Sequence, residues 1–318
     1  MVTPLNGRDK LDLKGLEHLI EHILEGGVAG LFILGTTGEG TSLSYRLRRE
    51  FVKRTCRQVR GRVPVLVGIT DTAFVESVHL SQHAATAGAD ALVVAPPYYL
   101  PGGQPELREY LEHLVAEVPL PLFLYNAPSV TKVQYELETL QWATGKPQIL
   151  GLKDSSRNMI YFQQALGARK QRPDWSLLIG PEELLAEAVL AGGDGGVPGG
   201  ANIFPGLYVQ LWEAARVADV ARTRRLHEQV MRISNSLYQI GRHPSAVLKG
   251  IKCALVCLGV CDDFIAEPFH RFRTEERERV QRCLPELAAG VERVLRENQS
   301  LRRSARISAT SRTCAESL

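Results

Sequence analysis

The sequence contains no segment suited to a membrane or to export. A spanning helix needs about 20 consecutive apolar residues, and no run in the chain approaches that length. Residues 1–12 lack a basic stretch followed by an apolar one, so they do not resemble a secretory signal. Six cysteines in 318 residues, without such a signal, argue against a disulfide framework. We therefore expect a cytoplasmic protein.

A strong charge of one sign is missing as well. The formal net charge is +3, with 23% charged residues, which is ordinary for a globular protein. This composition gives no reason to expect binding to nucleic acid or to a membrane surface. Hydrophobic residues make up 44% of the chain, enough to bury the core of one large α/β domain.

The histidines and cysteines do not predict a metal site. Metal sites need three or four ligands that converge, whereas here pairs or triplets recur four residues apart without a further ligand nearby. Cysteines spaced in this way on one helix face are usually small core residues. We expect no metal at these positions, which are His18 and His22, His79 and His83, and Cys253, Cys257 and Cys261.

Seven short apolar runs recur along the chain, separated by longer segments with helical spacing. Runs of this kind are typical of strands buried on both faces of a parallel sheet. Together with a weak first strand at Val2-Thr3, they predict a (β/α)₈ TIM barrel. An open sheet that binds a dinucleotide is disfavoured, because Gly35–Gly40 does not match its glycine pattern. The runs are residues 31–34, 65–67, 91–94, 122–125, 149–153, 177–179 and 195–197.

The strand signals stop after about residue 220. We expect the barrel and its active site in residues 1–220 and a C-terminal helical segment in residues 221–297. Residues 298–318 are rich in serine and arginine and have no apolar period, so we predict a disordered tail there.

Lys153 is the most conspicuous candidate for chemistry. In a barrel, side chains at the C-terminal ends of the strands face the active site, and Lys153 closes an apolar strand. Desolvation there favours the neutral amine, which can attack a carbonyl group. An isolated lysine at a strand end more often extends toward water. Here Tyr125 ends the preceding strand and can pass protons, and Thr36 and Thr37 offer hydroxyl groups.

Two glycine-rich segments are candidates for holding an anion. Gly35-Thr-Thr-Gly38 precedes a predicted helix, so its backbone N–H groups suit a carboxylate, although a plain strand-to-helix turn has the same composition. Gly192–Gly200 is either a tightly packed strand or a phosphate site. It contains no arginine or lysine, which disfavours a phosphate.

Five motifs in order resemble the pyruvate-dependent class I aldolases of the dihydrodipicolinate synthase and N-acetylneuraminate lyase family. The resemblance covers about residues 2–290 and implies a barrel that uses no separate cofactor, because pyruvate is held as a Schiff base. The family is usually a homotetramer. The motifs are Gly35-Thr-Thr-Gly-Glu39, Pro97-Tyr-Tyr99, Tyr125-Asn-Ala-Pro128, Gly151-Leu-Lys-Asp154 and Gly192-Gly-Asp-Gly-Gly196.

The resemblance also implies roles for individual residues. Lys153 forms the imine with C2 of pyruvate, and Tyr125 donates and accepts protons. Thr36 links Tyr125 to Tyr99, which reaches in from a neighbouring subunit. Thr37 and the backbone of Val197 hold the pyruvate carboxylate.

Three departures from the family pattern leave the aldehyde partner open. The first strand looks clipped, and Val130 stands where the synthases carry an arginine that grips aspartate semialdehyde, with Lys132 as the nearest cation. Gly199 occupies the position of a serine in the sialic acid lyases. Gly180, Glu182 and Glu183 follow the strand at residues 177–179 and are further candidates for binding the substrate. The pair Glu182-Glu183 is similar to the acidic pair with which those lyases bind sugar hydroxyls.

The leading hypothesis is a lyase that joins or cleaves pyruvate and an aldehyde, acting on a hydroxylated 2-oxo acid such as a 2-keto-3-deoxy sugar acid or an N-acetylneuraminate-like substrate. The alternative is a 4-hydroxy-tetrahydrodipicolinate synthase. A 2-keto-3-deoxy acid dehydratase would use the same lysine, and a barrel that binds a 2-oxo acid without turnover is disfavoured by the intact set of Lys153, Tyr125, Thr36 and Thr37.

We predict that pyruvate and borohydride together add a reduced pyruvyl group to Lys153. Mass spectrometry of the digested protein locates the adduct. Lys153→Arg should abolish it, because a guanidinium group stays protonated and cannot form the imine. An adduct on a different lysine, or none on the wild type, would refute the assignment.

Overall fold

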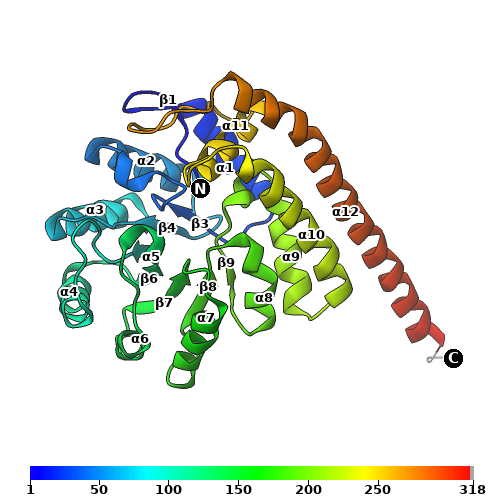
Figure 1. The fold of residues 1–318 in the computed structure, drawn as a ribbon. Coiled ribbons are helices and arrows are strands. Elements are labelled where there is room, and N and C mark those ends of the chain that lie inside the picture. Colours follow the sequence, from blue (N-terminus) through cyan, green and yellow to red (C-terminus); the bar gives the residue numbers. More distant parts are fainter. Residues whose placement is uncertain (316–318) are drawn as a thin grey trace.

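The computed structural model describes residues 1–315, and side chains through residue 297. Its centre is a curled parallel sheet covered by helices on the outside (Figure 1). The strands follow one another in the sheet in chain order, which confirms the seven predicted runs and the barrel fold. They are β3 (Leu31–Ile33), β4 (Val65–Gly68), β5 (Ala91–Val94), β6 (Leu122–Asn126), β7 (Ile149–Asp154), β8 (Ser176–Ile179) and β9 (Gly195–Gly196).

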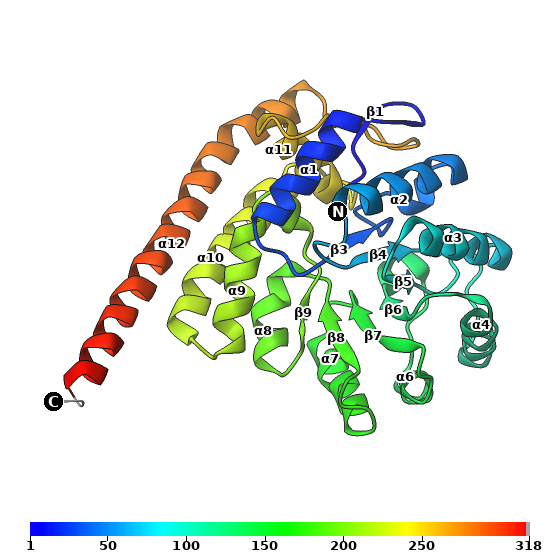
Figure 2. The ribbon, with the colours of Figure 1, turned by 180° about the vertical axis from the view of Figure 1, so that it is seen from behind.

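The helices between the strands form the outer layer, as Figure 2 shows from behind. Several begin at a side chain that accepts a backbone N–H, such as Asp12 before α1 and Ser44 before α2. The barrel helices are α1 (Leu13–Glu25), α2 (Tyr45–Val59), α3 (Phe74–Ala87), α4 (Gln104–Glu117), α5 (Pro128–Thr131), α6 (Leu137–Thr144), α7 (Met159–Leu166), α8 (Leu185–Leu190) and α9 (Pro205–Arg216). Short 3₁₀ turns include η1 (Gly40–Ser42), η2 (Gly167–Lys170), η3 (Glu182–Leu184) and η4 (Gly199–Asn202).

Alternate residues of each strand face two different cores. In β6, Leu122 and Leu124 belong to the large core between the sheet and the helices. Phe123 and Tyr125 instead join a smaller cluster with Phe32. Because side chains of a strand alternate between its faces, this smaller cluster is the inside of the barrel. The catalytic candidates therefore stand above a packed interior.

The described residues Val2-Thr3, where the sequence predicts the first strand of the barrel, do not form a strand. Residues Met1–Thr3 lie between the two edges of the sheet: the Met1 amine donates to the Phe32 carbonyl on β3 at 2.6 Å, and the Val2 N–H donates to the Asn202 side chain after β9 at 2.9 Å. Val2 is fully buried. This segment occupies the eighth position without strand pairing, and a hairpin of β1 (Leu5–Gly7) and β2 (Lys10–Leu11) follows it.

The C-terminal segment is helical and packs against the barrel. It consists of α10 (Val220–Ser236), η5 (Leu237–Gln239), α11 (Ala246–Cys257) and α12 (Thr274–Ala315). In both views α12 runs alongside α10 and continues past it (Figures 1 and 2). Among the described residues, no helix is both long enough and apolar enough to span a membrane.

The end of the chain differs from the prediction of a disordered tail over residues 298–318. Helix α12 continues to Ala315, and the sequence contains neither glycine nor proline between Gly290 and that point to interrupt it. Residues 316–318 lie outside the described residues.

Gly151 is required where β7 passes β8, two residues before Lys153. A Cβ atom at this position would overlap the Ser176 carbonyl oxygen and crowd the Phe123 ring. We expect Gly151→Ala to lower the free energy of unfolding by about 1–3 kcal/mol, the usual cost of overpacking, as measured by urea denaturation. Gly167→Ala is the matched control, since nothing lies within 4 Å of its added Cβ. Equal stability of the two variants would contradict this account.

Candidate active site

Strands β6 and β7 bring Lys153 and Tyr125 together. The two residues are register partners in adjacent parallel strands, so their side chains project from the sheet at the same level. Each is only 8% exposed. The Lys153 ammonium nitrogen lies 3.9 Å from the centre of the Tyr125 ring. A buried amine therefore stands directly beside a phenol.

Phe32 on β3 forms the opposite wall of this site, which the sequence reasoning did not identify. Its ring centre lies 4.9 Å from the Lys153 nitrogen and 6.1 Å from the Tyr125 ring, which it meets edge to face. Aromatic faces stabilise a cation that has lost its water shell. The signal was present in the sequence: Phe32 is the residue of its strand that alternation with Leu31 and Ile33 places inside the barrel.

The hydroxyl group of Tyr125 is set by hydrogen bonds. Thr36 Oγ1 lies 3.1 Å from it, so the loop after β3 reaches the end of β6. Burial by itself would raise the pKa of Tyr125, but the Lys153 ammonium and hydrogen bonds to Thr36 and Ser155 outweigh that effect. The pKa of Tyr125 is therefore below its ordinary value, which suits a group that must release and regain a proton.

Ser155 is a second site residue that the sequence reasoning missed. It stands two positions after Lys153, so strand alternation already places the two side chains on one side of the sheet. Gly180 makes room for it, because a Cβ at Gly180 would overlap the Ser155 hydroxyl. The Gly180 N–H is donated to the Asp154 carbonyl at 2.7 Å. In the structure, Gly180 therefore leaves space for the Ser155 side chain.

The two glycine-rich segments meet across the barrel mouth. A Cβ added at Gly199 would lie 3.9 Å from the Thr37 hydroxyl, so the loop after β9 faces the loop after β3. Thr37 and Val197 are both half-buried there. The Val197 N–H is donated to the Ile179 carbonyl at 2.8 Å, which corrects the expectation that this backbone group is available to a carboxylate. Thr37 remains a candidate for binding the carboxylate.

Glu182 does not face the barrel mouth, which corrects the expected pair of acidic residues for sugar hydroxyls. Its carboxylate is 5% exposed and accepts hydrogen bonds from the hydroxyls of Tyr208 (2.5 Å) and Tyr238 (2.9 Å) and from the Gly200 N–H (2.6 Å). Burial raises the pKa of Glu182 above its ordinary value. The turn η3 directs the side chain into the protein, where these donors satisfy it.

Glu183 is also engaged inside the protein. The Ser234 hydroxyl on α10 donates to its carboxylate at 2.7 Å. The acidic pair therefore joins the barrel to the C-terminal helices.

Tyr99 does not reach the site of its own chain. Its side chain is 95% exposed and its φ is +78°, a left-handed conformation that is uncommon for a bulky residue. The neighbouring Leu100 is 81% exposed. The structure thus separates Tyr99 from Lys153, Tyr125 and Thr36.

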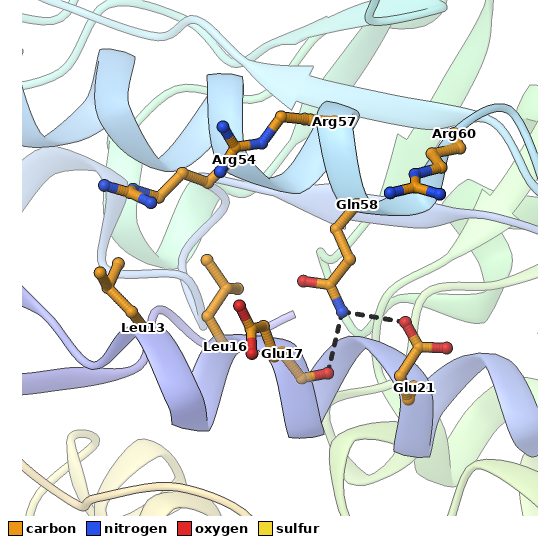
Figure 3. A pocket seen from close by; sticks show the side chains of 8 residues that line it. All are labelled: Leu13, Leu16, Glu17, Glu21, Arg54, Arg57, Gln58 and Arg60. Carbon is orange, nitrogen blue, oxygen red and sulfur yellow. Dashed lines mark hydrogen bonds between the residues drawn. The ribbon is translucent and has the colours of Figure 1, made fainter.

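A second hollow, of about 530 Å³, lies in the outer layer and takes no part in this site. Figure 3 shows it between α1 and α2, where the Gln58 side chain reaches from α2 toward Glu17 and Glu21 on α1. Gln58 donates to the Glu17 carbonyl and to the Glu21 carboxylate, both at 2.9 Å. Glu21 also pairs with Arg62 at 2.6 Å. Among the described residues, no group of histidine, cysteine, aspartate and glutamate is placed to hold a metal ion.

Comparison with known proteins gives a family. The model of the Dihydrodipicolinate synthetase family matches residues 1–287. The chain is 30% identical over 284 residues to the 4-hydroxy-tetrahydrodipicolinate synthase of Pseudomonas putida, covering 89% of this chain and 95% of the relative.

Solved structures agree with that match. The dihydrodipicolinate synthase of Bacteroides thetaiotaomicron is 55% identical, with a TM-score of 0.88 over 90% of this chain and 96% of the other. The Escherichia coli protein YagE, named a putative 2-dehydro-3-deoxy-D-gluconate aldolase, is 34% identical over 79% of this chain and 82% of its own. Its structure in complex with pyruvate has a TM-score of 0.84, over 90% of this chain and 96% of that one.

Tyr125→Phe should slow turnover by about 10²–10⁴-fold, the usual span for loss of a positioned acid–base group. Borohydride trapping of pyruvate should survive, because Lys153 remains in place. Steady-state kinetics and trapping measure the two effects separately. Tyr161→Phe is a matched control, since its hydroxyl donates to the Tyr135 carbonyl behind the sheet. Near-wild-type turnover of Tyr125→Phe would make Tyr125 a packing residue.

Proposed function

We propose that this chain, which belongs to the dihydrodipicolinate synthetase family of lyases, joins or cleaves pyruvate and an aldehyde through a Schiff base on Lys153. The observation that carries the proposal is the buried Lys153 amine, held in register with Tyr125 at the end of two neighbouring strands. Tyr125 in turn contacts the Thr36 hydroxyl. These three groups come from two neighbouring strands and from the loop after β3, and they converge at one point of the barrel mouth.

The chemistry follows from these groups. The neutral Lys153 amine attacks C2 of pyruvate, and water leaves as the imine forms. The protonated imine draws electrons, so C3 loses a proton and the resulting enamine attacks the aldehyde carbon. Tyr125 supplies the proton that the new alkoxide takes up, and its lowered pKa favours this exchange. Hydrolysis of the product imine restores Lys153, and no separate cofactor is needed.

Thr37 is the proposed contact of the pyruvate carboxylate. Its hydroxyl lies at the mouth opposite Gly199. The Val197 side chain packs against the barrel interior beside Tyr125, where it suits the methyl end of pyruvate. The Val197 N–H is already donated to Ile179, so this residue shapes the pocket through its side chain.

A hydroxylated aldehyde is the proposed second substrate. Val130 occupies the position at which the synthases of this family carry an arginine, and it is 50% exposed. Lys132 is the nearest cation in sequence, and its ammonium donates to the Ser129 carbonyl at 3.0 Å, which holds it at the end of α5. A carboxylate on the aldehyde thus lacks a charged partner at this position. The hydroxyls of Ser155 and Thr36 beside Tyr125 suit a polyhydroxylated chain.

A 4-hydroxy-tetrahydrodipicolinate synthase, using pyruvate and aspartate semialdehyde, is the second candidate. The 55% identity to the B. thetaiotaomicron protein named dihydrodipicolinate synthase favours it. The loss of Glu182 and Glu183 as mouth-facing ligands also removes one argument for a sialic acid substrate. The two candidates share every proposed step up to the enamine.

We further propose a cytoplasmic homotetramer in which Tyr99 completes the site of a neighbouring copy. An almost fully exposed tyrosine next to an exposed leucine is unfavourable in water, and a contact with another protein chain would bury both.

The cysteines support the proposed cytoplasmic location. Five of them are free thiols, which suits a reducing compartment; they are Cys56, Cys253, Cys257, Cys261 and Cys283.

The substrate proposal predicts a ranking of aldehydes. A hydrogen bond to a charged group contributes about 1.5–3 kcal/mol, so the missing arginine should weaken aspartate semialdehyde by about ten- to a hundred-fold. With pyruvate present, kcat/KM should be higher for glyceraldehyde, an aldotetrose, an aldopentose or N-acetylmannosamine. Val130→Arg should raise kcat/KM for aspartate semialdehyde selectively. A clear preference of the wild type for aspartate semialdehyde would restore the synthase assignment.

A further inference from the structure

Glu39 and Lys252 form a buried ion pair beneath the barrel mouth. Glu39 ends the Gly35–Glu39 loop, and Lys252 lies in α11, far along the chain. Their side chains are 2% and 0% exposed, and a Glu39 carboxylate oxygen contacts the Lys252 ammonium. Neither residue belongs to the reacting groups described above. Complete burial of a lysine costs free energy unless the ammonium group is paired and hydrogen-bonded.

Two backbone groups complete the polar contacts of this pair. The Lys252 ammonium donates to the Phe264 carbonyl at 2.7 Å. The second carboxylate oxygen of Glu39 accepts the Ala266 N–H at 2.7 Å, across 227 positions of sequence. Glu39 is therefore held from two sides by the C-terminal segment.

The loop that Glu39 ends has an unusual backbone. Leu34, which directly precedes the loop, and Glu39, its last residue, have φ angles of +58° and +56°. Residues other than glycine rarely adopt this left-handed conformation, and it persists where surrounding contacts hold it. Gly40 also packs against the Leu34 carbonyl, where a Cβ would overlap it. Thr36 and Thr37 lie between these two points.

We propose that Glu39 and Lys252 are a positioning pair that holds Thr36 and Thr37 against Tyr125 and the pyruvate carboxylate. Buried ion pairs contribute little net stability compared with apolar residues of the same volume, so the contribution assigned to this pair is to the arrangement of the loop. This loop is Gly35–Glu39, and the φ angles of Leu34 and Glu39 at its two ends are disfavoured. The inference rests on the proposed function for what the loop binds, whereas the contact of Thr36 with Tyr125 is independent of it.

The test compares Glu39→Gln, Lys252→Met and the double variant. Each single change leaves one buried charge without its partner, so the thermal midpoint should fall. The double variant carries neither charge, and its midpoint should recover toward that of the wild type. The half-saturating pyruvate concentration in borohydride trapping should nevertheless stay about tenfold higher in all three, because one polar contact is worth about that factor.

A second measurement needs no substrate. NMR of protein with ¹³C-labelled tyrosine follows the titration of Tyr125, with Tyr125→Phe identifying its signal. Displacement of Thr36 removes a hydrogen bond that lowers the pKa of Tyr125, so this pKa should rise in the double variant. If wild-type protein does not trap pyruvate, the proposed function fails and this titration still decides the role of the pair.

Arg222→Met is the matched control. Arg222 on α10 is a mostly buried cation of the same segment, paired with Glu213 at 3.3 Å, and it does not contact the loop. It should lower the thermal midpoint while leaving pyruvate trapping and the Tyr125 titration unchanged. A double variant of Glu39 and Lys252 with wild-type pyruvate affinity and wild-type Tyr125 titration would overturn the proposal, and the pair would then be structural alone.

Discussion

An ammonium group that leaves water must find compensation inside the protein, and the surroundings of Lys153 are arranged to provide it. Two aromatic faces, those of Tyr125 and Phe32, lie within 3.9 and 4.9 Å of its nitrogen, and a desolvated cation over such a face gains about 2 kcal/mol. The closeness of the Lys153 ammonium also lowers the pKa of Tyr125, so one contact both stabilises the buried cation and favours ionisation of the phenol.

That contact depends on how the strands are registered. Tyr125 and Lys153 face each other because β6 pairs with β7 at these two residues, and a shift of one residue would turn one of them to the other face. Asn126 and Asp154, the next pair, point away from the interior and bond to each other at 2.8 Å. Gly151 allows β8 to approach β7 closely just below Lys153. The register is thus held on both faces of the sheet.

Side chains of the C-terminal helices contact the loops that follow two barrel strands. Glu39 after β3 and Glu182 after β8 are both buried carboxylates, and donors from α11, η5 and α9 satisfy them. A buried carboxylate that lost these donors would be very unfavourable. These contacts tie the loops at the mouth to the helices that satisfy the two carboxylates. The boundary predicted near residue 220 coincides with the start of α10, which packs against the barrel helix α9.

Local pattern in the sequence was sufficient to predict the barrel and the juxtaposition of Lys153 and Tyr125. The seven strands follow from short apolar runs, and Lys153 and Tyr125 follow from polar residues placed where two such runs end. Strand alternation would also have placed Phe32 and Ser155 at the site. These features depend on neighbours within a few positions, which a sequence displays directly.

Other features depend on contacts between distant residues, and for them the tertiary structure was decisive. Whether Glu182 faces the mouth or the interior depends on the hydroxyls of Tyr208 and Tyr238, which lie 26 and 56 positions away. The partner of Glu39 lies on α11, and the unpaired segment Met1–Thr3 takes its place through Phe32 and Asn202. A buried polar group takes the direction in which its hydrogen bonds can be satisfied. The sequence by itself determined which residues are available for the chemistry, and only the folded chain decided which polar side chains turn toward the substrate and which hold the loops.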